Sequence, residues 1–524
     1  MLTKLYSAAI QGIDALPVTI ETEVSRGSQF TIVGLPDTTV KESYQRVTTA
    51  LAQSGFSFPH RRTTINLSPA DVKKEGASLD LPLALGILAS NEYFTDVRFE
   101  DYMFMGELSL DGSVLPVKGA LPMAVKAREM GFRRIIVPEA NVTEAAVVNR
   151  VEVYGVKSLA ETVQILLGQS DLKPTVINTR ELFNADAGSF DYDFSEVKGQ
   201  ESVKRAFEVA CAGGHNILMI GPPGAGKSMM AKRLPSILPP LSMSEALETT
   251  KIHSVAGKLS RGSMLMTRRP FRTPHHTVSP VALVGGGASP MPGEISLAHN
   301  GVLFLDEFPE FPRQVLEVLR QPIEDRVITV SRAKYTVDYP ASFMLVASMN
   351  PCPCGYYGHP TRRCTCTAGQ VSRYLSRISG PLLDRIDLQI EIEPVKFDEM
   401  ASDEVAESSA QIRERVINAR AVQLQRFATE KGIHCNAQMN SRLLRQHAWP
   451  DAQGLAKLKE RMERLNMSAR AFDRILRVAR TIADLDYAAT MEPAAAVTAP
   501  VLSRHIAEAI GYRSLDRHSY GSSF

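Results

Sequence analysis

The chain has 524 residues, of which 44% are hydrophobic and 22% charged, and this composition is typical of a folded globular protein of about three domains. The formal net charge is only +2, so global charge is no evidence for a nucleic-acid partner and any such evidence has to be local. The apolar runs fall far short of the ~20 residues of a membrane span, and the N-terminus lacks the apolar segment of a signal peptide. We therefore expect a cytoplasmic protein that has no membrane partner.

Residues 1–170 are expected to form an α/β domain with a core of its own. Short apolar stretches predict strands, and segments with helical periodicity that end in glycine predict helices. The predicted strands are 18–24, 29–33, 63–67 and 134–138, and the predicted helices are 38–55 and 115–131.

Two stretches of this domain resemble the proteolytic domain of the Lon family. The sequence EGASLD at 75–80 is similar to the segment around the Lon catalytic serine, with Ser78 at the position of the nucleophile. Residues 117–141 are similar to the segment that carries the Lon catalytic lysine, but Met123 stands at the position of that lysine. A thioether cannot accept the proton of a serine hydroxyl. The resemblance therefore implies a Lon-like fold without peptidase activity.

Alternative interpretations remain open for the residues of this Lon-like segment. Lys118 and Lys126 lie near Met123 in the sequence and are amines that a peptidase would be able to use instead. For Ser78 we favour a structural role as a helix N-cap, with Asp80 in the first turn of that helix.

After a polar linker at 171–195, the chain contains a complete phosphate-binding loop. The sequence NILMIGPPGAGKS at 216–228 predicts a buried strand, a glycine-rich turn and a helix that begins with Lys227 and Ser228. Backbone N–H groups of such a turn surround a phosphate, while Lys227 reaches the β- and γ-phosphates and Ser228 holds Mg²⁺. The expected cofactors are therefore ATP and Mg²⁺. The expected nucleotide-binding residues are Gly221, Pro222, Pro223, Gly224, Ala225, Gly226, Lys227, Ser228 and Asp306.

Two further apolar strands end in polar residues that suit ATP hydrolysis. The sequence GVLFLDE at 301–307 ends in Asp306, which would complete the Mg²⁺ shell, and Glu307, which would polarise the attacking water. The sequence LVASMN at 345–350 ends in Asn350, whose amide can bond the γ-phosphate or the water. Their order after the P-loop resembles that of AAA+ ATPases, in which Asn350 would stand at the sensor 1 position.

The segment GPLLDRID at 380–387 resembles the arginine-finger segment of the magnesium-chelatase and MCM branch of AAA+ ATPases. The resemblance implies that Arg385 reaches the nucleotide of a neighbouring subunit, which requires a ring or a stack of subunits. The alternative is a local ion pair of Arg385 with Asp384 or Asp387. The ATPase core is expected to span residues 196–395.

Basic insertions in the core point to a nucleic-acid partner. Residues 251–293 contain no acidic side chain, and a predicted β-hairpin at 326–339 carries basic residues at its tip. These segments resemble in position the helix-2 insert and the pre-sensor hairpin that line the pore of hexameric motors of the same branch. Arginine and lysine in a pore suit a DNA backbone and need no base readout. Together with two arginines of the cysteine loop, the residues expected to contact DNA are Arg268, Arg269, Arg272, Arg332, Lys334, Arg362 and Arg363.

Four of the six cysteines fall in the sequence CPCGYYGHPTRRCTC at 352–366. Two C-x-C pairs suit tetrahedral Zn²⁺, and a reducing compartment favours a metal over the alternative of two disulfides. His359 is an alternative ligand, and the remaining Cys211 and Cys435 are expected to be core thiols. The expected metal ligands are Cys352, Cys354, Cys364 and Cys366 for zinc, and Ser228 and Asp306 for magnesium.

Residues 396–510 are expected to form a helical lid, followed by a polar tail at 511–524. The most regular helix is predicted at 468–486, where apolar residues line one face. Arg470 at its start resembles the sensor 2 arginine of AAA+ lids, and Arg474 is the alternative.

The full order of these segments resembles the ComM/YifB family. The expected fold class is α/β, with a Lon-like α/β N-terminal domain before an AAA+ P-loop core and a helical lid. The resemblance implies a hexameric, ATP-driven motor that acts on single-stranded and branched DNA and promotes branch migration in natural transformation and recombination. The catalytic residues are then expected to be Glu307, Lys227, Asn350, Arg385 and Arg470.

Two other functions remain as alternatives. The core also resembles the ATPase motor subunit of a magnesium-chelatase-type metal insertion complex, although such a subunit needs neither a Lon-like domain nor a thiolate loop. An ATP-dependent protease is the third interpretation, and Met123 at the lysine position argues against it.

Overall fold

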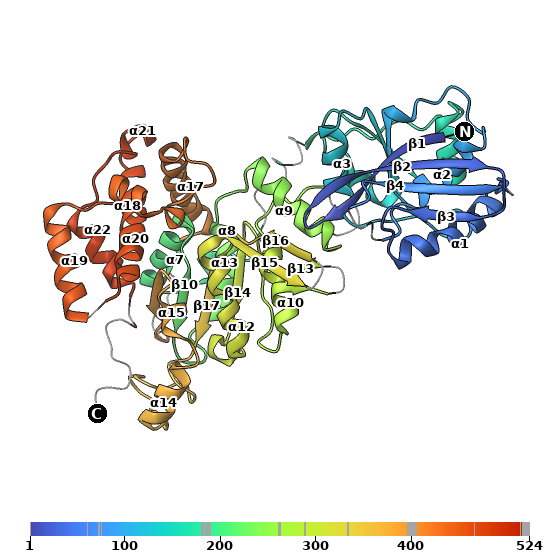
Figure 1. The fold of residues 1–524 in the computed structure, drawn as a ribbon. Helices are drawn as coiled ribbons and strands as arrows, with labels where there is room; N and C mark the ends of the chain where they lie inside the picture. Colours follow the sequence, from blue (N-terminus) through green and yellow to red (C-terminus); the bar gives the residue numbers. More distant parts are fainter. Residues whose placement is uncertain are drawn as a thin grey trace.

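The computed structural model describes residues 2–59, 61–71, 74, 76–179, 183, 190–259, 264–287, 290–332, 335–395, 406–465, 467–513 and 515. These residues form an N-terminal α/β part, a central part built on a parallel sheet, and a helical part, which follow one another across the molecule (Figure 1). The expected α/β fold class with a P-loop core is confirmed by this arrangement.

The N-terminal part contains a four-stranded sheet and a smaller parallel sheet. In the first sheet the strand order is β1-β2-β4-β3, and helices α1 (Thr38–Gln53) and α2 (Asp80–Ser90) pack on it. Its strands are β1 (Leu2–Gln11), β2 (Asp14–Ser25), β3 (Phe30–Val33) and β4 (Arg62–Ser68). The second sheet consists of β5 (Tyr102–Phe104), β8 (Arg134–Pro138) and β9 (Glu152–Val156).

Two sequence predictions for this part differ from the structure. The helix predicted at 115–131 is the shorter α3 (Ala120–Glu129), because Gly119 takes a left-handed φ of 75° and Leu115 belongs to strand β7 (Val114–Leu115). The prediction that Ser78 is an N-cap is wrong. Helix α2 begins after Leu79 without a side-chain cap, and the Ser78 carbonyl instead accepts a hydrogen bond of 2.9 Å from the Gly106 N–H.

The central part is built on a five-stranded sheet in the order β11-β14-β17-β10-β18, in which every neighbouring pair is parallel. Its strands are β10 (Ile217–Ile220), β11 (Phe271–Arg272), β14 (Val302–Leu305), β17 (Met344–Met349) and β18 (Leu388–Glu391). The strand β10 that precedes the P-loop therefore lies between β17 and β18, inside the sheet.

Both faces of this sheet are covered, which explains why its strands are continuous apolar runs. Ile217 and Met219 point to a cluster that contains residues of α7 (Glu201–Gly213) and α8 (Lys227–Ile237). Leu218 and Ile220 belong to the opposite cluster. That cluster includes residues of α10 (Pro280–Val284), α12 (Arg313–Val318) and α13 (Arg320–Asp325).

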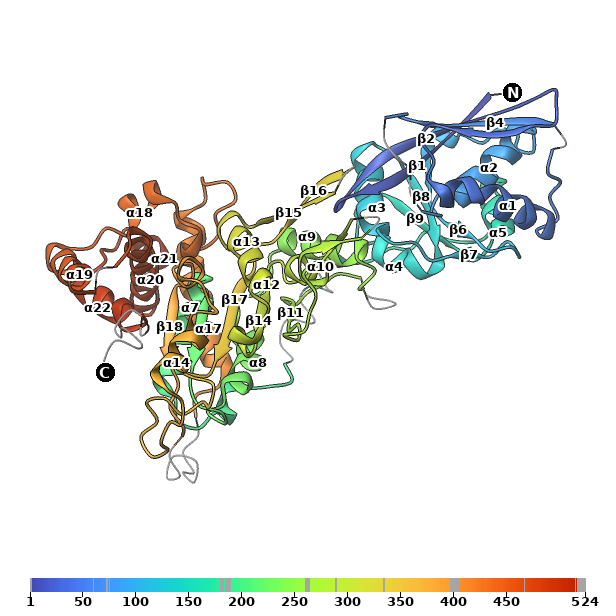
Figure 2. The ribbon, with the colours of Figure 1, turned by 60° about the horizontal axis from the view of Figure 1, so that its bottom comes forward.

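The predicted hairpin is present as β15 (Val327–Arg332) and β16 (Tyr335–Pro340), paired antiparallel. Figure 2 shows that it extends from the central part toward the ends of β1 and β2. There the added Cβ of a larger residue at Gly12 would lie 2.9 Å from Val337 Cγ1. The tip residue Lys334 lies outside the described residues, and of Arg332 only the backbone is described.

The N-terminal part also packs on α9 (Met243–Val255), which leads into the acid-free insertion. Lys251 Nζ lies 3.1 Å from Asp14 Oδ1, and the Gly119 N–H donates to the Ser254 carbonyl over 3.3 Å. The Ser254 hydroxyl donates to the buried carboxylate of Glu144. The N-terminal part is thus in contact with both of the basic elements that the sequence predicts to face DNA.

The helical part consists of α17 (Ser409–Arg426), α18 (Ser441–His447), α19 (Ala452–Leu465), α20 (Ala469–Ala488), α21 (Pro493–Ala496) and α22 (Ser503–Gly511). Its core is continuous with the α7 and α8 side of the central sheet. Inside it, the Arg426 guanidinium forms two hydrogen bonds of 2.7 and 2.6 Å with the carboxylate of Asp484.

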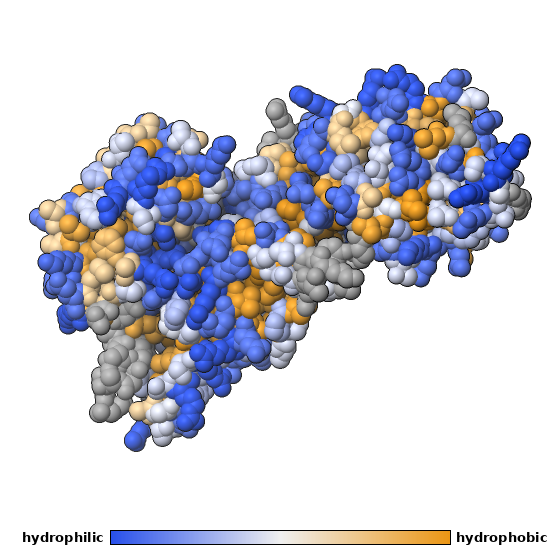
Figure 3. Space-filling view, viewed as in Figure 1, coloured by the Kyte–Doolittle hydropathy of each residue, from blue (hydrophilic) through white to orange (hydrophobic). Residues whose placement is uncertain are grey.

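Within the described ranges, no helix has the length and apolar character to cross a membrane. Figure 3 shows hydrophobic side chains on the surface of all three parts, interspersed with hydrophilic ones.

Candidate active site

The P-loop connects β10 to α8 and surrounds the ammonium group of Lys227. Gly224 and Gly226 have φ angles of 82° and 86°, a backbone conformation that glycine adopts at low cost. Lys227 Nζ donates to the carbonyl oxygens of Gly221 and Pro222 over 2.7 and 2.9 Å. The side chain is 9% exposed, and burial lowers the pKa of Lys227 from its ordinary value. The loop thus holds a cation where a phosphate would bind.

Two oxygen groups suited to magnesium meet beside this lysine. The Ser228 hydroxyl donates to Asp306 Oδ2 over 2.6 Å, and the Ser348 hydroxyl donates to the other oxygen of the same carboxylate. A hydroxyl and a carboxylate next to a phosphate site are the protein ligands that Mg²⁺ uses with nucleoside triphosphates. The residues present therefore fit Mg²⁺ and ATP. The ion would neutralise phosphate charge there.

The polar ends of three parallel strands converge on this point. Asn350 follows β17, and its Oδ1 accepts a hydrogen bond of 3.1 Å from Lys227 Nζ. Asp306 and Glu307 follow β14, which is the neighbour of β17. Because ligands of open parallel sheets bind at the carboxyl ends of the strands, the sheet brings the P-loop, Asp306 and Asn350 together as the sequence predicts.

Glu307 points to a different partner from that of Asp306. Its carboxylate Oε2 lies 3.2 Å from Nδ1 of His276, and the glutamate side chain is 58% exposed. Its backbone is left-handed, with φ of 53°, and its N–H donates to Asp306 Oδ1 over 3.0 Å. The sequence did not predict this His276 contact, because the two residues are 31 positions apart and β11, which precedes His276, has only two residues.

Arg385 forms an ion pair, but not with either acid that the sequence suggested. Its Nη2 lies 2.8 Å from Glu324 Oε2 in α13, and its Nη1 donates to the Pro381 carbonyl over 2.7 Å. Asp387 instead pairs with Arg474 at 3.0 Å. The acid partner of Arg385 is thus 61 residues away in the chain and was not predictable from local sequence.

The two candidate sensor arginines of α20 differ in environment. Arg474 is 7% exposed and is held by the buried Asp387, whereas Arg470 is exposed at the first turn of the helix. Arg470 lines a cavity of about 380 Å³ together with Glu324, which is the partner of Arg385. In the wall of this cavity, burial and the neighbouring Arg474 lower the pKa of Arg477 to about 10. A cavity so rich in arginine suits an anion.

The four clustered cysteines are arranged as a metal site. All four sulfur atoms lie within 4.8 Å of one another, and the Sγ atoms of Cys352 and Cys364 are 3.7 Å apart. Tetrahedral zinc with Zn–S bonds of ~2.3 Å places sulfur atoms about 3.8 Å apart, so the donor set fits zinc. The four cysteines are free thiols, and His359 is not part of the group, since its Nδ1 accepts from the Arg362 N–H over 3.0 Å.

The cysteine loop rests against the P-loop. Gly355 has φ of 85°, and a Cβ added to it would lie 2.5 Å from Cδ of Pro223. The loop also follows Asn350 directly in the chain, so it is joined to the nucleotide site at two points. Arg362 and Arg363 are exposed on the outer side of the loop, where Arg362 Nη1 donates to the Tyr356 hydroxyl over 2.7 Å.

The predicted DNA-contacting arginines of the insertion have partners within the chain. Arg269 is only 12% exposed and lies 3.2 Å from Glu245, while it also donates to backbone carbonyls. Arg272 donates to Glu294 over 2.6 and 2.8 Å. Because the Arg269 guanidinium is buried and already paired, this conformation does not present it to a phosphate. Arg272 is also paired with its glutamate, but its side chain is 32% exposed.

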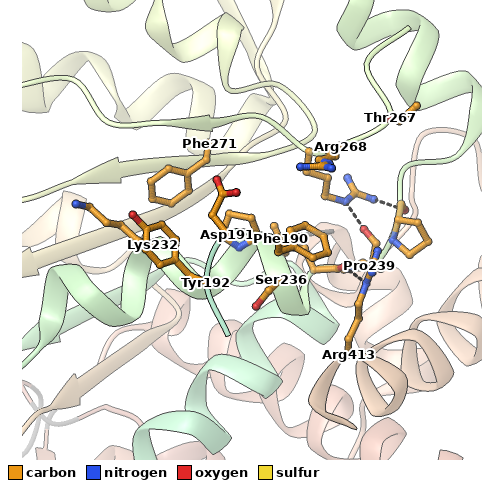
Figure 4. A pocket seen from close by; sticks show the side chains of 14 residues that line it. Phe190, Asp191, Tyr192, Lys232, Ser236, Pro239, Thr267, Arg268, Phe271 and Arg413 are labelled. Carbon is orange, nitrogen blue, oxygen red and sulfur yellow. Dashed lines mark hydrogen bonds between the residues drawn. The ribbon is translucent and has the colours of Figure 1, made fainter. Parts of the chain in front are cut away.

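Arg268 lines a cavity of about 200 Å³ at the end of α8 (Figure 4). Its guanidinium carbon lies 5.7 Å from the ring centre of Phe190, and that of Arg413 lies 5.1 Å from the same ring. Phe190 belongs to the segment that enters the central part. The two cations are therefore stacked on an aromatic ring of the protein itself.

Comparison with known proteins agrees with this geometry. Three family models match consecutive parts of the chain: subunit ChlI of Mg-chelatase at 20–141, magnesium chelatase subunit ChlI at 193–400, and the C-terminal region of that subunit at 406–513. The competence protein ComM of Haemophilus influenzae is 41% identical over 519 residues, which are 98% of each protein. The protein YifB of Escherichia coli is 42% identical over 522 residues, again 98% of each. This chain belongs to the ComM/YifB family.

The comparisons also describe the central and the N-terminal regions separately. The central region is a magnesium-chelatase-type AAA+ domain, a family that uses ATP and Mg²⁺. The N-terminal region is also similar to an archaeal Lon protease of Methanocaldococcus jannaschii, which is 27% identical over 117 residues, 22% of this chain and 18% of that protease. The Lon-like resemblance is thus confirmed as a weak one, and Met123 in this region is a core residue that is 1% exposed.

Proposed function

We propose that this protein is a cytoplasmic, ATP-driven DNA motor that works as a hexameric ring and promotes branch migration during natural transformation and homologous recombination. The observation that carries the proposal is the similarity over 98% of both chains to a protein named competence protein ComM. The geometry around Lys227 supports ATP hydrolysis, and the basic loops support DNA binding.

In the proposed ATPase, each side chain has one task. Lys227 binds the β- and γ-phosphates in exchange for its present carbonyl partners, and Ser228 and Asp306 hold Mg²⁺. Glu307 polarises the attacking water, and Asn350, which already contacts Lys227, orients the water or the γ-phosphate.

The ring is supported by the placement of Arg385. Its side-chain contacts are with α13 and with Pro381, and none of these residues belongs to the P-loop of its own subunit. Exposed Arg470 and Glu324 line the same cavity, so the proposed finger and the proposed sensor lie close together. An arginine supplied by a neighbouring subunit is worth about 10³–10⁵ in rate, which explains why a lone subunit would be a poor ATPase.

The proposed DNA contacts are the exposed arginines 362 and 363 and the tip of the β15–β16 hairpin. No acidic residue occurs from Tyr339 through Leu383, so the cysteine loop itself carries positive charge and no carboxylate. Such contacts bind the phosphate backbone and depend on salt rather than on base sequence. Of the insertion, we retain Arg268 and Arg272 in the proposal and exclude the buried Arg269.

A branch-migration assay tests the proposal. Purified full-length protein, at a concentration where it forms rings, is given a branched DNA substrate with ATP, and strand movement is followed on native gels. We expect movement by the wild type and none by Lys227→Ala. Absence of ATP-dependent strand movement by wild-type rings would refute the motor function.

The second candidate is the motor subunit of a magnesium-chelatase-type metal insertion complex. It is favoured by the three family models that carry the name of that subunit. The two functions differ in what stimulates hydrolysis. ATPase activity that rises with a porphyrin and partner subunits, but not with DNA, would support the chelatase and count against the DNA motor.

A further inference from the structure

The cavity at the end of α8 lies away from the nucleotide site at the start of the same helix (Figure 4). Lys232, Pro235 and Ser236 of α8 line it, and its described lining includes no residue of the P-loop. With a rise of roughly 1.5 Å per residue, Ser236 lies about 14 Å along the helix from Lys227. A ligand in this cavity would therefore be a different molecule from the ATP of the P-loop.

Three aromatic side chains line the cavity. Phe190 and Tyr192 come from the segment that enters the central part, and Phe271 comes from β11. Next to Tyr192, the Asp193 carbonyl accepts a hydrogen bond of 2.9 Å from Arg233 Nε. The Arg233 guanidinium carbon also lies 5.4 Å from the ring centre of Tyr192. The segment that carries two of these rings is thus anchored to α8.

The lining also carries an excess of positive charge. Its charged members are Asp191, Lys232, Arg268, Arg269 and Arg413. Apart from Arg269, which pairs with Glu245, three cations are therefore matched by one carboxylate. Burial lowers the pKa of Arg413, so a nearby negative charge would stabilise its guanidinium. The cavity therefore suits an anion.

Two of these cations lie against one ring. The guanidinium carbons of Arg268 and Arg413 are 5.7 and 5.1 Å from the ring centre of Phe190, although the two arginines belong to distant parts of the chain. Arg413 Nε also donates to the Leu238 carbonyl over 3.2 Å, which fixes its guanidinium at the end of α8. Guanidinium planes and aromatic rings are the surfaces on which proteins stack unpaired nucleobases. The cavity offers both surfaces, beside cations that suit a phosphate.

The size of the cavity limits what can enter. Its volume is about 200 Å³, whereas pockets for drug-sized ligands measure about 300–1,000 Å³. One ring system fits such a space, but a base pair does not. Tyr192 and Lys232 are exposed, so the cavity is open to solvent there, and the sugar and phosphate of a nucleotide would be able to stay outside.

We infer that this cavity binds one unpaired nucleotide, with its base against the aromatic and guanidinium groups and its phosphate at Lys232. The nucleotide would come from a single strand of DNA or from free nucleotides, since both offer the same base and phosphate. For a DNA strand, the inference rests on the proposed motor function and specifies how Arg268 would hold that strand. A base within a duplex is excluded, because its neighbours in the stack cover both of its faces.

Photochemical cross-linking of the full-length protein tests the site directly. One arm uses a single-stranded oligonucleotide that carries one 5-iodouracil, and the other uses free 5-iodo-dUMP, both without ATP. Irradiation joins this base to an aromatic side chain that lies against it, and mass spectrometry of the digested protein identifies the residue. We expect adducts at Phe190, Tyr192 or Phe271, and the arm that gives them identifies the source of the nucleotide. Because the wild type is used, this result depends on the folding of no variant.

Two variants separate stacking from charge. Phe190→Leu keeps an apolar side chain but removes the ring, so it should weaken binding of the single strand by about fivefold to a hundredfold and leave its salt dependence unchanged. Lys232→Ala should reduce the slope of log K against log salt by about 0.7, the value for one phosphate contact of a single strand. Fluorescence anisotropy of a labelled strand at several salt concentrations measures both effects.

Lys459→Ala is the matched control for the change of charge. Lys459 is 73% exposed in α19, and its Nζ lies 3.9 Å from Glu463 Oε1, outside the cavity. Its removal should leave the affinity and the salt slope at the wild-type values. An equal loss of slope in Lys232→Ala and Lys459→Ala would show that only the general charge of the protein matters, and would overturn the phosphate contact at Lys232.

The outcomes separate this inference from the motor function. A protein that binds the single strand but gives adducts only at other residues, such as Tyr356 of the cysteine loop, would overturn the inference and leave the motor function standing. Adducts at the cavity from free 5-iodo-dUMP alone, with no binding of DNA, would support the nucleotide site and count against the motor. A protein that binds neither probe would overturn both.

Discussion

In this site we expect single side chains to separate nucleotide binding from hydrolysis. Lys227 is surrounded by the P-loop. Glu307 follows strand β14, and its side chain is 58% exposed. We expect Glu307→Gln to bind ATP like the wild type but to lose hydrolysis by about 10²–10⁴-fold, the usual contribution of a general base. Fluorescent nucleotide titration and a phosphate-release assay would measure the two quantities.

The control for this change is three residues away. Glu310 is 45% exposed and pairs with Arg377 at 2.6 Å, outside the nucleotide site. Glu310→Gln should therefore keep hydrolysis near the wild-type rate. Equal losses in the two variants would show that the charge of this turn, and not the position of Glu307, matters.

We expect His215 to make the stability of the protein depend on pH. The residue is fully buried, and burial lowers the pKa of His215 to about 4. Below its ordinary pKa near 6.5, His215 binds a proton in the unfolded chain but stays neutral in the folded protein. Acidification therefore stabilises the unfolded state relative to the folded state. The free energy of unfolding should accordingly fall by about 3 kcal/mol through His215 alone as pH drops from 6.5 to 4.

Chemical denaturation at pH 7 and pH 4.5 would measure this effect. The loss of stability on acidification should be smaller in His215→Asn than in the wild type. His434→Asn, an exposed site, should leave the loss unchanged. An identical pH dependence in all three proteins would contradict the burial argument.

At the scale of secondary-structure elements, we expect two arginines of helix α20, Arg474 and Arg470, to differ in role. Arg474 pairs with the buried Asp387 before β18, so Arg474→Ala leaves this carboxylate buried without its arginine, although it still accepts from the Asn216 N–H, and should cost about 3 kcal/mol of unfolding free energy. Arg470 is exposed, and Arg470→Ala should change stability by less than ~0.5 kcal/mol while it lowers the ATPase rate of rings. Thermal unfolding and ATPase assays on both variants would separate the two roles.

The cysteine loop is the element for which we expect folding to depend on a metal. We expect about one zinc per chain in protein purified without chelator, since four thiolates complete a tetrahedral site. Cys352→Ser should lose the metal, whereas Cys435→Ser, whose thiol lies outside the group, should keep it. Elemental analysis of the purified proteins measures this directly, and a metal-free wild type would contradict the site.

The elements that were predictable from the sequence share one property. Strands β10, β14 and β17 are buried on both faces, so their apolar runs mark their bounds almost to the residue. β11 has two residues and carries no pattern, and the alternation of β1 was not recognised as a strand. The sequence therefore predicts the central residues of the site, because the ends of these strands and the P-loop fix the positions of their side chains.

The contacts that sequence missed join distant segments. Arg385 was assigned acids one or two residues away, but a short helix, α15 (Gly380–Leu383), and the packing of α13 bring Glu324 to it instead. His276 meets Glu307 for the same reason, because β11 lies beside β14 in the sheet. Such pairs depend on tertiary packing, which no local pattern encodes.

At the scale of the whole molecule, the proposed ring can be tested by mixing two inactive variants. Lys227→Ala lacks the P-loop lysine and Arg385→Ala lacks the finger, so each alone should be inactive. In mixed rings about a quarter of the sites would combine an intact P-loop with an intact finger from the next subunit. Recovered ATPase activity on mixing would show that the arginine acts between subunits, and no recovery would show that it acts within one.

From the close approach of Gly355 to Pro223, we expect the nucleotide site to be sensitive to oxidants of the proposed zinc loop. A reagent that oxidises the four thiols would release the zinc and collapse the loop, although none of these sulfur atoms is expected to touch ATP. The P-loop would lose the surface against which Pro223 rests, and ATP would bind more weakly. We therefore expect the ATPase rate of the proposed motor to fall under oxidative stress and to recover on reduction and resupply of zinc.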